Sequence, residues 1–369
     1  MRTVQKIIEL ATKLAPAKLA ASWDNVGLTV GDYNQVVNRV LLSLDVNYMV
    51  LEEAISKGCQ LIIAHHPFIF QGMKSIRSDD VVGRIIMKAV KNDISIFSAH
   101  TNLDIATKGL NDYLANILEI RDLVPIDITQ KTKYYKLVVF TPDDYFERVR
   151  TAILDAGAGH IGNYSHTSFS VKGEGTFKAQ KGSNPFIGQV GETSNVQESR
   201  FETLITEDRI DSVVNEMLKA HPYEEVAYDL YPLLFEGDKY GFGRVGKLDN
   251  KVRLIDYLDK VKLKLNLSYL RYVGEDDAII QKIAVCSGSG VSLIKQAKAT
   301  GADLYITGDV KFHEAQMAKD LGLNLLDAGH YETEVIVKNM LLEYFKRQST
   351  TNNLQVDFIK SEVNTNPWK

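Results

Sequence analysis

The sequence predicts an α/β protein with a discontinuous, layered core and an inserted, smaller α+β domain. In the first and last thirds of the chain, short apolar runs alternate with amphipathic helical patterns, a rhythm typical of a mainly parallel sheet. Between these parts the rhythm changes. The length of 369 residues exceeds what one hydrophobic core usually fills, which is about 150 residues. We therefore predict a core domain formed by residues 1–128 and 239–369 and an inserted domain over residues 129–238.

The first part of the chain begins with an amphipathic helix and continues with alternating strands and helices. Residues 1–20 carry apolar side chains at helical spacing, interrupted by lysine and glutamate. They lack the continuous apolar core of a signal peptide or a membrane span, so a cytoplasmic protein is expected. Strands are predicted at residues 26–30, 40–44, 60–64 and 94–99, and helices are predicted to end at Gly58 and to run over residues 81–92.

The inserted domain has the order strand, helix, two strands, helix, strand, which is that of a ferredoxin-like domain. Residues 133–140 predict its first strand, residues 142–155 a helix and residues 157–175 a hairpin region. Residues 180–199 are polar and predict a long, mobile loop. The last elements are a strand at residues 203–205, a helix over residues 209–220 and a strand over residues 225–231.

The last part of the chain resumes the first rhythm with a helix around residues 254–263. Three strand–helix units follow. Their strands are predicted at residues 283–286, up to residues 307–309 and up to residue 326 or 327, and their helices over residues 291–299, around His313 and Glu314, and up to about residue 345.

Two turns have more than one interpretation. Trp23, Asp24 and Asn25 precede the first short strand, where Trp23 is either a buried residue beside an Asx turn or part of the wall of a site. The glycine-rich turn Ser287–Gly290 either binds an anion at the start of a helix or is a structural corner.

Composition excludes several classes of partner. A net charge of -4, with 24% charged and 45% hydrophobic residues, is ordinary for a globular protein and offers no general attraction for nucleic acid or acidic membranes. Nucleic acid is therefore an unlikely partner, and no membrane partner is expected. Cys59 and Cys286 are the only cysteines, so the chain has no disulfide framework and no cysteine-based zinc pattern.

Histidines gather where open α/β sheets place their chemistry, at the carboxyl ends of strands. His65 and His66 directly follow the apolar run Leu61–Ala64, and Pro67 cannot continue a central strand. Both imidazoles are therefore expected in a cleft outside the sheet. His100, His313 and His330 also lie near predicted strand ends, whereas His160, His166 and His221 lie in the inserted domain, where structural roles are expected.

A second pair of candidate ligands lies on a helix. His330 and Glu334 are four residues apart and share a helix face, although such a pair alone is more often a solvated surface. With His65, His66 and Asp104 they supply three imidazoles and two carboxylates at the ends of elements that can converge. One zinc ion needs only three or four protein ligands, so five favour two ions that share a carboxylate. The absence of thiolates leaves zinc, iron and manganese open.

His100 and Asp309 are candidates to orient ligands or to carry protons, and His100 is the candidate catalytic residue. Both residues can equally be structural polar groups.

Five segments resemble the signature of a known family: SWDNVGL, IIAHHPFIF, SAHTNLD, ITGDVKFHEA and DAGHYETE. They are similar to the GTP cyclohydrolase 1 type 2 homologues, also called NIF-three-like dinuclear metal centre proteins. The resemblance implies a cytoplasmic, toroidal homohexamer with two divalent metal ions per subunit. It implies the metal ligands His65, His66, Asp104, His330 and Glu334.

The inserted segments AGAGHIGNYSHTSF and AHPYEEVAYDL resemble the PII/CutA-like domain that longer family members carry. The family name implies a hydrolase in which water attacks C8 of the guanine of GTP, opens the imidazole ring and releases formate. Lys311 and the turn Ser287–Gly290 are then candidates for phosphate binding. The alternatives are a non-catalytic metal-binding or regulatory scaffold and a metal-dependent phosphoesterase.

Overall fold

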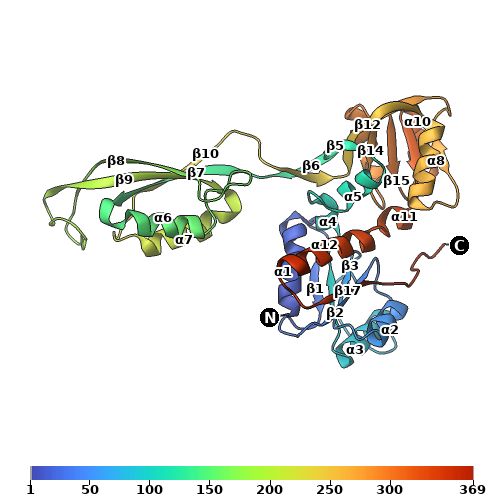
Figure 1. Cartoon of the computed structure of the whole chain (residues 1–369), viewed down its shortest axis with the longest axis horizontal. Coiled ribbons are helices and arrows are strands. Elements are labelled where there is room, and N and C mark those ends of the chain that lie inside the picture. The colour runs from blue at the N-terminus through green and yellow to red at the C-terminus, as the bar shows by residue number, and fades with distance from the viewer. Residues whose placement is uncertain (1, 369) are drawn as a thin grey trace. The chain divides into compact units, whose positions relative to one another are not determined.

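The computed structural model describes residues 2–368, which form two compact units (Figure 1). The core unit contains residues 2–130 and 239–368, and the inserted unit contains residues 131–238. In the described part of the chain, no helix is both long and apolar enough to span a membrane.

The core unit contains a five-stranded sheet in the order β1-β4-β3-β2-β17. Its four strands from β4 to β17 are parallel, and β1 at the edge is antiparallel. The strands are β1 (Gly27–Val30), β2 (Arg39–Ser43), β3 (Leu61–Ala64), β4 (Ser95–Ser98) and β17 (Asp357–Lys360). The helices of this part are α1 (Val4–Leu14), η1 (Ala17–Leu19), α2 (Tyr48–Ser56), α3 (Val81–Lys91), α4 (Thr101–Ile105), α5 (Leu110–Ile117) and α12 (Val337–Thr351).

Helices cover both faces of this sheet, and this explains why β3 is a continuous apolar run without alternation. Leu61 and Ile63 belong to the cluster that includes residues of α1 and α12, whereas Ile62 belongs to the cluster of α2 and α3. Every residue of β3 is buried. The strand is therefore a rigid support for the two histidines that follow it.

The core unit contains a second sheet of six strands in the order β13-β16-β15-β14-β12-β5. Its strands are β5 (Arg121–Val124), β12 (Arg244–Arg253), β13 (Arg271–Val273), β14 (Ile279–Val285), β15 (Leu304–Thr307) and β16 (Asn324–Asp327). A separate ribbon pairs β6 (Asp127–Lys131) with β11 (Lys239–Phe242). The helices are α8 (Leu254–Leu265), η4 (Val291–Leu293), α9 (Ile294–Ala299), α10 (Phe312–Asp320) and α11 (His330–Glu334).

The second sheet is mixed, so it agrees only in part with the prediction of a mainly parallel core. Only β14, β15 and β16 run parallel, while β12, β5 and β13 are antiparallel to their neighbours. The missed strand β12 is rich in charged residues, and its last residues are exposed. A half-exposed strand next to a sheet edge does not need the apolar run by which a central strand is recognised.

Arg244 joins the two halves of the core. Its buried guanidinium donates to Asp112, at 2.7 Å from Nε, and to the carbonyl oxygens of Ile105 and Ala106 at 3.2 and 2.8 Å. It also donates to the carbonyl oxygens of its own strand region. The end of α4 is thereby fixed to β12.

The inserted unit has a four-stranded antiparallel sheet in the order β10-β7-β9-β8, with two helices packed against it (Figure 1). The element order is βαββαβ. Its elements are β7 (Tyr134–Pro142), η2 (Asp143–Tyr145), α6 (Phe146–Asp155), β8 (Ser168–Lys178), β9 (Thr193–Thr206), η3 (Glu207–Arg209), α7 (Ile210–Ala220) and β10 (Tyr228–Pro232).

The predicted loop over residues 180–199 is too long. Strand β9 already begins at Thr193, and its residues 193–203 pair with the whole of β8, which leaves residues 179–192 as the loop. Most of β8 is exposed on both faces. Strand β8 has no buried face, so its sequence shows no alternation of apolar and polar residues.

Candidate metal centre

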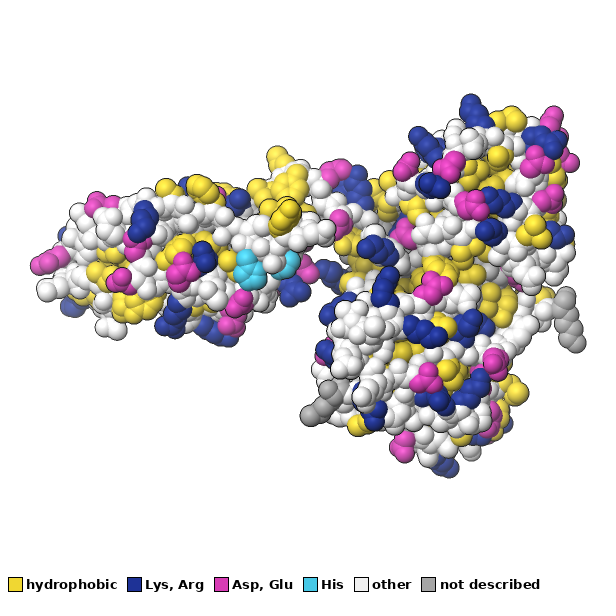
Figure 2. Space-filling view, in the orientation of Figure 1, with side chains coloured by type: hydrophobic (Ala, Val, Ile, Leu, Met, Phe, Trp, Pro, Cys, Tyr) yellow, Lys and Arg dark blue, Asp and Glu magenta, His cyan; other side chains and the backbone are white. Residues whose placement is uncertain are grey.

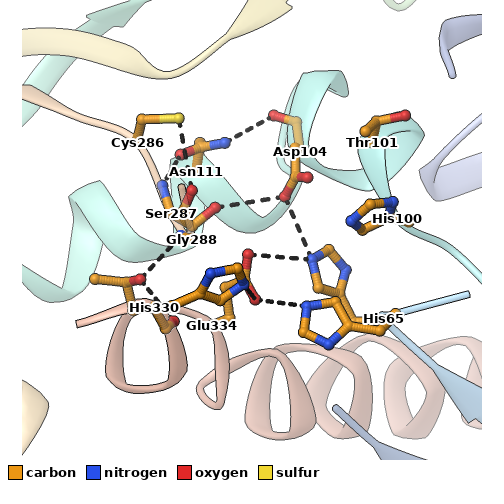
Figure 3. A network of polar contacts seen from close by, with 12 residues as sticks. His65, His100, Thr101, Asp104, Asn111, Cys286, Ser287, Gly288, His330 and Glu334 are labelled. Atoms are coloured by element: carbon orange, nitrogen blue, oxygen red, sulfur yellow. Dashed lines mark hydrogen bonds and ion pairs between the residues drawn. The ribbon is translucent and has the colours of Figure 1, made fainter. Parts of the chain in front are cut away.

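The candidate site lies in the core unit, where both sheets end (Figure 3). The first sheet supplies His65 and His66 after β3, and α4 after β4 supplies Asp104. The second sheet supplies the turn after β14, and helix α11 after β16 supplies His330 and Glu334. The five side chains that the sequence predicts to converge are brought together.

His65 carries the clearest sign of a missing partner. Its ring is completely buried, and its Nδ1–H donates to the carbonyl oxygen of Ala99 at 2.9 Å. In the neutral ring Nε2 is therefore a lone-pair acceptor, and within residues 2–368 it has no hydrogen-bond partner. It lies 3.7 Å from Asp104 Oδ1 and 3.8 Å from Glu334 Oε1. A buried nitrogen that faces two carboxylates in this way is poised to bind a cation.

His66 and His330 each lie between two carboxylates. Behind each ring a carboxylate accepts the Nδ1–H: Asp45 at 2.6 Å for His66 and Asp309 at 2.7 Å for His330. In front of each ring, Nε2 lies 2.8 and 3.0 Å from Glu334 Oε2. A carboxylate behind the ring fixes the orientation of an imidazole and makes the nitrogen in front more basic.

Without a metal ion these groups form a strongly coupled cluster. Burial alone would lower the pKa of His66, but the hydrogen bonds to Asp45 and Glu334 raise it to about 10. The hydrogen bond to Glu334 also raises the pKa of His330, to about 9. Burial opposes ionisation of Glu334, but the three imidazoles hold its pKa well below the ordinary value. Glu334 is therefore ionised and is shared by all three rings.

Within residues 2–368, two sets of three ligand atoms lie close enough to hold a cation. In each set the atoms lie within 4.8 Å of one another: His65, His66 and His100 form one, and His66, His330 and Glu334 form the other. Both sets include His66. The structure therefore provides groups that could bind metal ions.

Gly288 leaves the space that Glu334 occupies. A Cβ at this position would lie 2.0 Å from Glu334 Oε1, and the backbone φ is +61°. Three N–H groups of this turn already have partners: Ser287 donates to Asn111 at 2.8 Å, and Gly290 donates to Thr307 at 2.9 Å. Gly288 donates to Thr333 at 2.9 Å. These bonds favour the structural corner over the anion site.

His100 lies at the edge of the cluster and is oriented by Asp24. Its Nδ1–H donates to Asp24 Oδ1 at 3.0 Å, which leaves Nε2 as a proton acceptor. Asp24 also accepts from the N–H of Thr101 at 3.0 Å. Burial opposes ionisation of Asp24, but the hydrogen bonds from His100 and Thr101 lower its pKa to about 2. The geometry suits a base held by an ionised carboxylate.

Trp23 is not a buried residue, since 59% of it is exposed. Its ring centroid lies 6.1 Å from that of His100 and 5.9 Å from that of Phe70, which is 50% exposed. The side chain of Asn25 donates to the carbonyl oxygen of Ile69, and this bond ties the two aromatic segments together. Trp23 and Phe70 thus form an exposed aromatic wall beside the cluster.

The remaining histidines lie outside both sets of ligand atoms. His313 is exposed on α10, and His160 and His166 are exposed in the inserted unit. His221 donates from Nε2 to the carbonyl oxygen of Phe140 and accepts at Nδ1 from the N–H of Tyr223. Burial lowers the pKa of His221. This ring is therefore neutral and has a structural role.

Sequence reasoning missed the orienting role of Asp45 and Asp24. Asp45 ends the segment after β2, a position at which polar side chains reach a site, and this signal could have marked it. The hydroxyl of Thr365, 320 residues away, donates to the other oxygen of Asp45. No local pattern reports that contact.

Comparison with known proteins identifies the family. A profile of the Duf34/NIF3 (NGG1p interacting factor 3) family matches residues 2–367. A Bacillus subtilis protein called GTP cyclohydrolase 1 type 2 homolog is 44% identical over 364 residues, covering 99% of this chain and 97% of that protein. A relative of the same name from Halalkalibacterium halodurans is 43% identical over 364 residues, covering 99% and 98%.

Solved structures agree with this match. The structure of a Bacillus cereus protein related to NIF3 is 41% identical and has a TM-score of 0.88, covering 100% of this chain and 98% of that chain. A Staphylococcus aureus protein with 31% identity has a TM-score of 0.81 at the same coverage. The chain belongs to the Duf34/NIF3 family.

Proposed function

We propose that this protein is a dinuclear-metal-dependent hydrolase of the GTP cyclohydrolase type, which opens the imidazole ring of guanine in GTP and releases formate. The observation that carries the proposal is the buried Nε2 of His65, which has no hydrogen-bond partner in the described part of the chain and faces two carboxylates at 3.7 and 3.8 Å. The name of the relatives supports the choice of substrate.

The donor set fits divalent metal ions. Imidazole nitrogen and carboxylate oxygen bind zinc at about 2.0–2.2 Å, so two ligands of one tetrahedral ion lie about 3.3–3.5 Å apart. The separations of 3.7 and 3.8 Å around His65 Nε2 are close to that spacing. Zinc, iron and manganese all suit this set. We assign two ions to His65, His66, Asp104, His330 and Glu334.

Bound ions would act as Lewis acids and lower the pKa of water to near neutrality. The chain itself supplies the proton transfer. His100 Nε2 accepts a proton, and ionised Asp24 stabilises the imidazolium that results. Asp45 and Asp309 keep the rings of His66 and His330 in position.

The aromatic wall favours a substrate with a flat ring. Trp23 and Phe70 are exposed beside His100, and an exposed aromatic face stacks on a base with about 1–3 kcal/mol. A protein that only stores or carries metal ions has no use for such a wall. Lys311, two residues from Asp309, is exposed and is our candidate for a phosphate contact.

A non-catalytic metal-binding scaffold and a metal-dependent phosphoesterase remain the alternatives. We further propose a cytoplasmic homohexamer and a PII/CutA-like origin for the inserted unit, which is supported by its βαββαβ order.

The test compares the wild type with His65→Ala and Glu334→Ala, and uses His313→Ala as the control because that histidine is exposed outside the cluster. Metal content and formate release from GTP are measured for all four. We expect about two equivalents of metal and formate release in the wild type and control, and loss of both in the other two variants. Full metal content without formate release would reject GTP as the substrate. Unchanged metal content in both variants would refute the ligand assignment.

A further inference from the structure

The inserted unit contains a groove that plays no part in the metal centre. Its volume is about 690 Å³, which lies in the range of small-molecule sites. It is lined by β8, β9, the loop over residues 179–192 and the segment that follows α7. On the face of this unit seen in Figure 2, hydrophobic side chains gather between charged ones.

Glycines of β8 form the floor of this groove. Alternate residues of a strand face the same side, so Gly173 and Gly175 lie in line with Phe177. A Cβ at Gly173 would meet no atom within 4 Å, whereas a Cβ at Gly175 would lie 2.1 Å from Glu198 Oε2. Glycine weakens a strand interior and often marks a place where a ligand approaches the backbone. The open space above Gly173 is such a place.

Three aromatic rings stand around this floor. The ring centroid of Tyr223 lies 5.9 Å from that of Phe177 and 6.4 Å from that of Phe186. The Tyr223 hydroxyl donates to Glu198 Oε1 at 2.9 Å. Burial and this bond raise the pKa of Tyr223, so its phenol stays neutral. The N–H of Asn184 donates to Glu224 at 2.9 Å and holds the loop at the groove.

The charges that line the groove are unbalanced. Lys172 and Arg200 are already neutralised, by Asp143 at 2.8 Å and by Glu202 at 2.9 Å. Lys178 is the other lining cation. Four lining carboxylates have no ion pair with lysine or arginine within residues 2–368: Glu174, Glu198, Glu224 and Glu225.

We propose that this groove is a binding site for a small organic cation, an amine or quaternary ammonium ion with an apolar group. Aromatic faces attract such cations, and the Glu198 carboxylate at the bottom provides the opposite charge. An anion would meet uncompensated carboxylates there, and an uncharged apolar ligand would gain nothing from them. The groove shares no residue with the candidate metal centre.

The test uses choline and 3,3-dimethylbutan-1-ol, in which carbon replaces the charged nitrogen, together with benzoate as an anion. Binding to the full-length protein is measured by ligand-observed NMR. We expect saturable binding of choline with a millimolar Kd, and binding of the alcohol and benzoate that is at least about tenfold weaker. No saturable binding of choline, or equal binding of choline and its isostere, would overturn the proposal.

Two variants locate the site. Gly173→Val adds a branched side chain to the floor of the groove, where a Cβ meets no atom within 4 Å, and should weaken choline binding about tenfold while the Tm stays the same or rises. Glu198→Gln keeps a partner for Tyr223 but removes the charge, and should weaken choline binding about tenfold. Glu216→Gln on α7, which pairs with Lys219 away from the groove, is the control. Unchanged choline affinity in a folded Gly173→Val protein would place the site elsewhere and refute the assignment.

Discussion

Asp45→Asn should weaken the metal centre although Asp45 is not one of the assigned ligands. Asp45 accepts the Nδ1–H of His66 at 2.6 Å and is held by the hydroxyl of Thr365. Asparagine can still accept this hydrogen bond. It lacks the negative charge of Asp45, which makes the lone pair of His66 Nε2 a better ligand for a metal ion. Loss of such a carboxylate typically lowers metal affinity about 10–100-fold. This corresponds to about 1.4–2.7 kcal/mol.

The assay is chelator competition on metal-loaded protein, read as the chelator concentration that removes half of the metal. Asp357→Asn is the matched control, because Asp357 pairs with Arg39 at 2.8 Å on the surface and its side chain is 52% exposed. We expect a shift of about one to two orders of magnitude for Asp45→Asn and none for the control. Equal shifts in the two variants would refute the reasoning that Asp45 acts through His66.

Three further predictions follow from named contacts. Asp24 has a pKa of about 2 in the folded chain against 3.8 ordinarily, so the stability that its ionised form provides is present above about pH 4 and is lost as the pH falls toward 2. Asp24→Asn should therefore reduce the slope of the free energy of unfolding against pH in that window, and an unchanged slope would contradict this. Trp23→Ala should weaken GTP binding about tenfold and leave metal content unchanged, because the side chain is exposed beside the cluster. Binding is measured by equilibrium dialysis, and an unaltered Kd would exclude the aromatic wall from the substrate site. Arg244→Leu leaves the Asp112 carboxylate and four carbonyl oxygens without their donor, so urea unfolding should show a loss of about 3–5 kcal/mol. A loss below about 1 kcal/mol would mean that Arg244 does not join the two halves.

The buried parts of the core were predictable because burial leaves a pattern in the sequence. β3 is apolar at every position and ends at His65, so both the strand and the place of its histidines follow from the chain itself. Helix α11 places His330 and Glu334 one turn apart, and that spacing is equally local. The convergence of these groups could be expected from their shared position at strand ends, while their role as metal ligands stays a prediction.

Elements without a buried face gave no such pattern. β8 is mostly exposed, and its hairpin was predicted too early in the chain. β12 is charged at its end, and it was missed. β17 has only four residues, and only its pairing with β2 makes it a strand.

Contacts between distant segments were also out of reach. The hydroxyl of Thr365 holds Asp45 across 320 residues, and Asp24 holds His100 across 76. The carboxylates that orient His66 and His100 are thus determined by the tertiary structure, and patterns within short sequence segments do not reveal them.

Anomalous scattering from crystals of the metal-loaded protein tests the two-ion assignment most directly. We expect two peaks in the cluster, with His65 Nε2 bonded to one of the ions and Glu334 bonded to at least one. Imidazole nitrogens should lie about 2.0–2.1 Å from zinc. A single peak, or a His65 Nε2 that contacts no ion, would contradict the assignment.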